Sequence, residues 1–193
     1  FKEAFNLAIQ KSALEEEKIG YMFSGDISNQ CESAAIGSRD LKIPFFGIYG
    51  ACSTFGEALS LGAMILDGGF AENIICGAGS HFCSAEKQFR FPLDLGTQRP
   101  PTSTWTVTGA GAAVLSADNK NSKIPKITYI TTGKIIDMGI KDASNMAAAM
   151  AGAACDVLSA HFNETGRSPE DYDVIATGDL GEVGKALVKK YMA

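Results

Sequence analysis

The sequence has little histidine, a residue from which zinc sites are commonly built. It contains only two histidines, His81 and His161, so a zinc site has little support. Its five cysteines stand at irregular spacings and form no C-x-x-C pair, which favours reduced thiols over a disulfide framework. We therefore expect neither a metal ion nor another cofactor.

Long apolar runs and an excess of positive charge are also missing. No run approaches the ~20 apolar residues that a membrane-spanning helix needs, and no secretory signal peptide is visible. The formal net charge of −5 provides no basic surface for nucleic acid. The rest of the composition, with 46% hydrophobic and 20% charged residues, is typical of a globular α/β protein. We expect a protein that is not secreted, has no transmembrane helix and binds no nucleic acid.

Helical and strand-like apolar spacings alternate along the chain. The patterns predict helices at residues 1–14, 29–39, 53–67, 145–162 and 182–192. They predict strands at residues 21–23, 44–49, 73–78, 105–117 and 173–177, with a further strand pair within 124–137. Residues 80–104 are polar, aromatic and rich in proline, and this stretch is too long for an ordinary connector, so it is predicted to be a functional loop.

Two segments of the chain repeat the same order of features. "GYMFSGDISNQ" and "YDVIATGDLGEVG" each follow a helix, and each runs from an apolar strand through Gly-Asp into another helix. Asp26 and Asp179 are predicted to cap these following helices. The first copy continues for much longer than the second, which stops fourteen residues after Asp179. The repeat predicts a duplicated fold that is truncated at both ends, with a first half at 1–120 lacking its first strand and an incomplete second half at 121–193.

Cys52 is the candidate nucleophile. It stands between the predicted buried strand at 44–49 and the predicted helix, at a turn that "GA" before it makes possible. Ser53 and Thr54 can cap the start of that helix, and Glu57, three or four positions further on, fits a capping box. A thiol at a helix N-terminus is favoured as the thiolate by the macrodipole and the free N–H groups. The alternative is that Cys52 is a small buried residue at a tight corner.

A duplicated α/β unit with a cysteine at the strand-to-helix turn resembles the thiolase fold, which thiolases and β-ketoacyl synthases share. More narrowly, the chain resembles the stage V sporulation protein AD family of spore-forming bacteria. The matching words run in order along the chain: "SGDISNQ", "IPFFGIYGACST", "DGGFAENII", "SHFCSAEKQFRFPLDLGTQRP", "WTVTGAGAAVL", "GKIIDMGIKDASNM" and "DYDVIATGDLGEVG". The resemblance implies a thiolase-like duplicated layered αβαβα fold and a homodimer that pairs through an edge strand at 73–79.

The same resemblance implies a function. Members of this family are understood to bind dipicolinic acid (pyridine-2,6-dicarboxylate), alone or with calcium, and to help load it into the developing spore. Their partners are membrane-bound sporulation proteins of the same operon type, so we expect a place in the cytoplasm or forespore, peripheral to the spore inner membrane.

The alternative function is that of an acyl-thioester condensing enzyme, of the β-ketoacyl synthase or thiolase type, with Cys52 as the catalytic nucleophile. Such enzymes activate their cysteine with bases from the second half. The chain has "GDLG" where the β-ketoacyl synthase III type carries a histidine motif. We therefore expect a binding protein without catalytic activity.

Dipicolinate is a flat aromatic dianion, so its site needs cationic or N–H donors for two carboxylates and an apolar wall for the ring. Arg90 and Arg99 are candidate cations, although Arg90 could instead form a salt bridge with Asp94 or Glu86. Trp105 is a candidate wall, although it could instead be a core residue. The complete set of candidate ligand-binding residues is Cys52, Ser53, His81, Gln88, Arg90, Arg99, Thr104 and Trp105.

Overall fold

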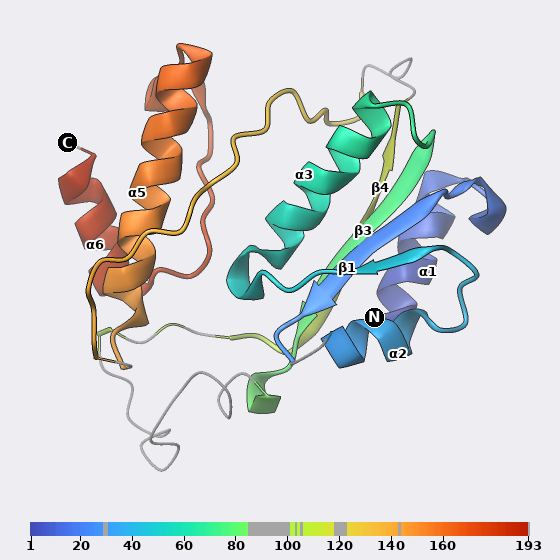
Figure 1. Ribbon diagram of the computed structural model, residues 1–193, viewed down its shortest axis with the longest axis horizontal. Helices are drawn as coiled ribbons and strands as arrows, with labels where there is room; N and C mark the ends of the chain where they lie inside the picture. The colour runs from blue at the N-terminus through green and yellow to red at the C-terminus, as the bar shows by residue number, and fades with distance from the viewer. Residues whose placement is uncertain are drawn as a thin grey trace. The chain divides into compact units, whose positions relative to one another are not determined.

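The computed structural model describes residues 1–28, 31–84, 101–102, 104, 106–117, 123–142 and 144–192 (Figure 1). The chain divides into two compact units, the first made of Phe1–Ala85 and Thr106–Thr128 and the second of Glu86–Trp105 and Tyr129–Ala193. The elements of the first unit are α1 (Lys2–Ser12), η1 (Glu16–Lys18), β1 (Tyr21–Asp26), α2 (Glu32–Ser38), β2 (Phe45–Gly47), η3 (Ala51–Ser53), α3 (Thr54–Asp67), β3 (Asn73–Ser80) and β4 (Gly109–Ser116). Those of the second are α5 (Met146–Thr165), η5 (Pro169–Asp171) and α6 (Gly181–Tyr191).

A four-stranded mixed sheet forms the centre of the first unit, with the strand order β2-β1-β3-β4 (Figure 1). β1 is parallel to both of its neighbours, and β4 is antiparallel to β3 over the full length of both strands. Parallel strands need crossover connections, which α2 and α3 supply. The predicted strands at 21–23, 73–78 and 105–117 are confirmed, with β4 covering only the second part of the last range.

Helices cover both faces of this sheet because successive side chains of a strand point to opposite faces. Met22 of β1 and Ile75 of β3 pack with Phe5 of α1 on one face. Phe23 and Cys76 belong to the cluster on the other face, which α3 covers (Figure 1). The first unit is therefore a three-layered α/β arrangement.

The strand before Cys52 differs from its prediction. β2 has three residues instead of six, and all three are exposed instead of buried. The physical reason is its place at the edge of the sheet, where only β1 pairs with it. β3, by contrast, is paired on both sides, so the prediction that residues 73–79 form a dimerising edge strand is wrong.

The predicted helix after Cys52 is confirmed as α3, but its predicted capping box is wrong. The N-cap residue Ser53 has helical dihedral angles (φ −92°, ψ −1°) and makes no side-chain capping bond. A capping side chain needs an extended N-cap backbone to reach the free N–H groups. The Ser53 hydroxyl instead donates a hydrogen bond to the carbonyl oxygen of Gly50 at 2.7 Å, inside the preceding turn.

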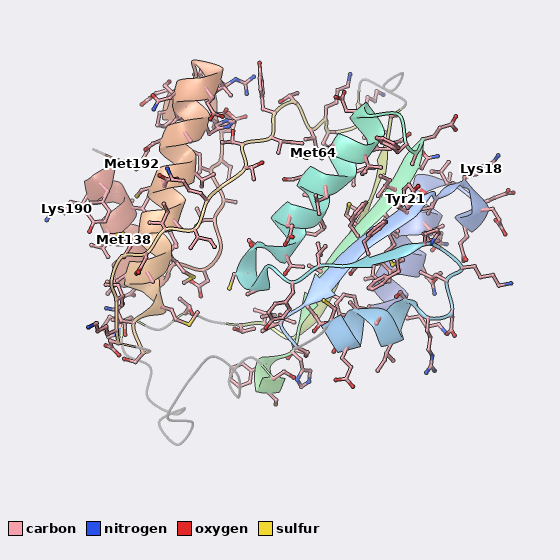
Figure 2. The ribbon with its side chains drawn as sticks, in the orientation of Figure 1. Lys18, Tyr21, Met64, Met138, Lys190 and Met192 are labelled. Carbon is pink, nitrogen blue, oxygen red and sulfur yellow. The ribbon has the colours of Figure 1, made fainter. Side chains whose placement is uncertain are left out.

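In the second unit, α5 and α6 pack closely at small residues. Ala147 is fully buried, and a Cβ atom built at Gly184 of α6 would lie 2.9 Å from the carbonyl oxygen of Ala147. Met138 lies against α5 at Gly152, where any side chain would collide with its sulfur atom (Figure 2). Gly166 ends α5 in the left-handed conformation (φ 66°), as the sequence predicted.

Two strand predictions are wrong. Residues 123–142 and 172–180 form no strand among the described parts of the chain. A strand is held by hydrogen bonds to a neighbouring strand, and these segments have no ladder partner there. Some of their apolar side chains consequently stay exposed, with Ile135 exposed by 99% and Val174 by 76%.

Both aspartates of the repeat accept a hydrogen bond from the start of the helix that follows them. An Asp26 carboxylate oxygen accepts a hydrogen bond from the N–H of Ala34 in the first turn of α2, at 2.8 Å. Asp179 accepts one from the N–H of Gly181, the first residue of α6, at 2.9 Å. Each aspartate therefore satisfies a free N–H group at the start of the next helix, although the N-cap residues themselves are Cys31 and Leu180. The predicted equivalence of the strands at 21–23 and 173–177 does not hold, because 173–177 forms no strand. The boundary at 120/121 stays a prediction.

We predict that Gly77→Ala lowers the free energy of unfolding by about 1–3 kcal/mol, because overpacking strains a filled core. The added Cβ atom would lie 2.4 Å from the Phe5 ring. Gly111→Ala on β4 is the matched control, since nothing lies within 4 Å of its Cβ position. Urea unfolding followed by circular dichroism provides the comparison, and equal stability of the two variants would contradict the close packing of α1 on β3.

Candidate functional site

Cys52 lies in the short turn of η3 between β2 and α3, and its side chain is exposed. The alternative interpretation, a small buried residue, is therefore wrong. Ala51 directly before it has φ 47°, a left-handed conformation that costs a residue with a side chain roughly 1–2 kcal/mol. The turn thus brings a reactive side chain to the surface at the start of α3.

Cys52 lines a pocket of about 310 Å³ on the first unit. The lining consists of Ile27, Ala51, Cys52, Thr54, Phe55, Ala78, Gly79, Ser80, Val107, Gly109, Ala110 and Gly111. These residues follow β1, start α3, end β3 and start β4, so the pocket lies where four elements meet. Its described lining is mostly apolar, has hydroxyl groups at Thr54 and Ser80, and contains no charged side chain. A volume at the small end of ligand pockets fits one small molecule.

Of the described candidate residues, one lines the pocket and the others do not. Cys52 lines the pocket, whereas Ser53 and His81 are exposed and do not belong to its described lining. Thr104 is half-buried and belongs to the second unit. The remaining four predicted ligands, Gln88, Arg90, Arg99 and Trp105, lie outside the described residues.

Sequence reasoning missed most of the pocket wall. Ile27 and Phe55 are the larger apolar residues of the lining that it did not name, together with Val107. One signal was available: each stands next to the end or the beginning of a predicted element, where side chains of several elements converge. Their apolar character alone could not distinguish them from core residues.

The other cysteines in the described sheet core are chemically different from Cys52. Burial raises the pKa of the Cys76 thiol to about 12. Burial also raises the pKa of Cys31, with a smaller contribution from the charge of Asp26, and its thiol donates a hydrogen bond to the carbonyl oxygen of Ile48 at 2.9 Å. Of these three cysteines, only Cys52 is exposed and lines the pocket.

His161 is held by two hydroxyl groups in the second unit. Its Nδ1 lies 2.8 Å from the hydroxyl oxygen of Thr131, and its Nε2 lies 2.5 Å from the phenolic oxygen of Tyr172. Arg167 donates a further hydrogen bond to Tyr172 at 3.2 Å and lies over the ring of Tyr129. Both ring nitrogens of His161 are thus engaged in a structural cluster.

The described residues include neither a metal-binding cluster nor a membrane-spanning helix. No group of three or more histidine, cysteine, aspartate or glutamate side chains there could hold a metal ion. Within the same residues, no helix has the length and apolarity needed to cross a membrane.

A mixed α/β sheet covered by helices, with a cysteine at the turn into one of them, fits the thiolase-like fold. Three solved structures share this fold over 99% of the chain. An OleA variant of Xanthomonas campestris bound with cerulenin has a TM-score of 0.73 and 18% identity, with 60% of its chain covered. 3-Oxoacyl-(acyl carrier protein) synthase III of Xanthomonas oryzae pv. oryzae has a TM-score of 0.72 and 16% identity, with 63% of its chain covered. AbyA1, a tetronic acid condensing enzyme, has a TM-score of 0.66 and 18% identity, with 66% of its chain covered. At these identities the likeness shows the fold alone.

A family comparison is more specific. The family model described as stage V sporulation protein AD (SpoVAD) matches residues 1–193. The stage V sporulation protein AD of Bacillus subtilis (strain 168) is 43% identical over 188 residues, which cover 97% of this chain and 55% of the relative. The chain belongs to the stage V sporulation protein AD family. It spans about 55% of the length of that curated relative.

We predict that Cys76 makes stability fall at alkaline pH. Its thiol stays protonated in the folded state up to a pKa of about 12, whereas the unfolded thiol ionises near its ordinary value of 9.0. Ionisation therefore stabilises the unfolded state as the pH rises from 9 towards 12. Between pH 8 and pH 10.5 the parent protein should lose about 2 kcal/mol more than Cys76→Ala does in urea unfolding. Cys83→Ala, which removes an exposed thiol, is the control and should follow the parent.

Proposed function

We propose that this chain is a dipicolinate-binding protein without catalytic activity, which helps to load dipicolinate into the developing spore. Family membership supports the sporulation role. The observation that carries the choice of binding over catalysis is the described pocket wall, which presents the Cys52 thiol with no histidine among its residues. A condensing reaction needs a base at the nucleophile, whereas ligand binding needs none.

The chemistry of the pocket fits one end of the ligand. Its apolar wall, with Phe55 and Val107, suits the flat pyridine ring. The first N–H groups of α3 have no side-chain cap and are suited to donate hydrogen bonds to one carboxylate. We propose Arg90 as the partner of the second carboxylate, with Arg99 as the other candidate.

We predict that Cys52→Ala weakens dipicolinate binding by only about 1–2 kcal/mol, the usual cost of one lost small contact. Arg90→Ala should cost more, because a carboxylate in a partly dry pocket loses a charge-assisted hydrogen bond. Isothermal titration calorimetry on the full chain measures both. Arg39→Ala is the control, since this exposed cation lies at the end of α2 and outside the pocket lining.

The exposed Cys52 beside a pocket also supports the second candidate, a condensing enzyme that uses this thiol. Incubation with acetyl- and malonyl-thioesters, followed by mass spectrometry of the Cys52 peptide, separates the two. We expect no adduct that turns over. A turning-over acyl adduct, together with no dipicolinate binding by the parent protein, would show that the condensing enzyme is the correct assignment.

The wider setting is proposed in the same way. We propose that residues 1–120 form the first thiolase-like half and that residues 121–193 open the second. The protein would act in the cytoplasm or forespore, peripheral to the spore inner membrane, with membrane-bound sporulation proteins as partners. The ligand would arrive alone or together with calcium.

We propose that a homodimer forms through β2. Among the described strands, β2 pairs on one side only, with β1, and Phe45 and Phe46 are 37% and 50% exposed. An exposed edge strand of this kind can form backbone hydrogen bonds with a strand of a second chain. Light scattering at micromolar concentration should give the dimer mass, and Phe45→Asp should give the monomer. Phe70→Asp, at an exposed position beyond the end of α3, should leave the dimer intact; a monomeric parent would refute this proposal.

A further inference from the structure

We infer that Val107 sets the size of the chemical group that the pocket accepts beside Cys52. The inference rests on the proposed function only for the identity of the ligand, because access to the thiol can be measured without it. It assigns a specificity-determining role to a residue that lies outside every helix and strand.

Val107 differs in size from the other described lining residues on its side of the pocket. The positions at the end of β3 and the start of β4 carry very small side chains: Ala78, Gly79, Ser80, Gly109, Ala110 and Gly111. Val107 is the large side chain that the described lining receives from this side. The other large side chains, Ile27 and Phe55, come from the end of β1 and the first turn of α3. On this side of the described lining, position 107 is therefore where the size of a side chain can change the space in the pocket.

Two hydrogen bonds hold Val107 in place. The Ser80 hydroxyl donates to the carbonyl oxygen of Val107 itself. The N–H of Phe82 donates to the hydroxyl oxygen of Thr108 at 2.9 Å. Both bonds continue the attachment of β4 to β3 beyond the last ladder pair, Ser80 with Gly109.

These bonds matter because packing does not hold this segment. The Val107 side chain is 67% exposed, so burial contributes little to its position. Among the described residues, these two side-chain bonds tie Val107 and Thr108 to the end of β3. Ser80 and Thr108 are therefore positioning residues, and Val107 is the wall that they position.

The first test measures the access of probes to Cys52 in the full chain, with Cys83→Ser as background because Cys83 is also exposed. Rates of labelling by N-ethylmaleimide and by the bulkier N-(1-pyrenyl)maleimide are measured by mass spectrometry of the Cys52 peptide. Val107→Ala should raise the ratio of bulky to small rates on the order of tenfold, and Val107→Phe should lower it. A ratio that neither change moves, in variants that unfold cooperatively, would overturn the inference.

Matched variants distinguish an effect of the Val107 side chain on the pocket from a general loss of structure. Phe70→Ala removes a side chain that is 71% exposed beyond the C-terminal end of α3, whereas Cys52 precedes its N-terminal end, so the ratio should stay unchanged. Thr108→Val removes the acceptor while keeping the shape, and it should shift the ratio in the same direction as Val107→Ala. Thr108→Ser keeps the acceptor and should restore the parent ratio. A shift with Thr108→Ser as large as that with Thr108→Val would refute the positioning role.

The second test uses dipicolinate and its benzo-fused analogue isoquinoline-1,3-dicarboxylate in calorimetry. Val107→Ala should improve the affinity for the larger ring relative to the smaller one on the order of tenfold. If the parent protein binds neither compound while the maleimide ratios shift as expected, the proposed function fails and the role of Val107 stands. If dipicolinate binds but the relative affinity is the same in Val107→Ala and the parent, the specificity role fails and the proposed function stands.

Discussion

β3 pairs through its backbone with β1 on one side and with β4 on the other, and the rest of the first unit depends on this double pairing. Because the register places Asp26 of β1 beside Gly79 and Gly109 of β4 beside Ser80, the end of β1, the end of β3 and the start of β4 meet at one edge. The pocket lies at this edge. A shift of register by one residue would turn every side chain of β3 to the opposite face and remove both the core and the pocket wall.

The same pairing explains why the end of β3 must be small. Gly77 faces the Phe5 ring so closely that a side chain would collide with it. Gly79 is equally close to the ring of Phe1. Phe5 of α1 and Phe1, which precedes α1, thus fill the space that glycines leave on one face, while on the other face the small residues leave room for a pocket. Core packing and the site are two consequences of one glycine- and alanine-rich strand.

A thiolase-like scaffold that keeps its cysteine need not keep its reaction. In the described lining, Cys52 meets apolar side chains and hydroxyl groups, and the ring nitrogens of His161 are engaged by Thr131 and Tyr172. The turn itself, with its left-handed Ala51, exposes a small side chain at a helix start whether or not a reaction follows. Fold and chemistry therefore have to be argued separately, as the low identities to the condensing enzymes require.

The sequence by itself determined the local elements and the reactive position. Apolar spacing predicted α1, α3, β3 and α5, glycine predicted the end of α5, and aspartates predicted two caps, because all of these depend on neighbours within a few residues. It also placed Cys52 at a turn before a helix. Only the tertiary structure decided which strand is an edge, that β2 is exposed, and that 173–177 forms no strand, since each depends on whether a distant partner supplies a hydrogen-bond ladder. The pocket wall at Ile27, Phe55 and Val107 likewise comes from segments up to eighty residues apart, which only the pairing of the strands brings together.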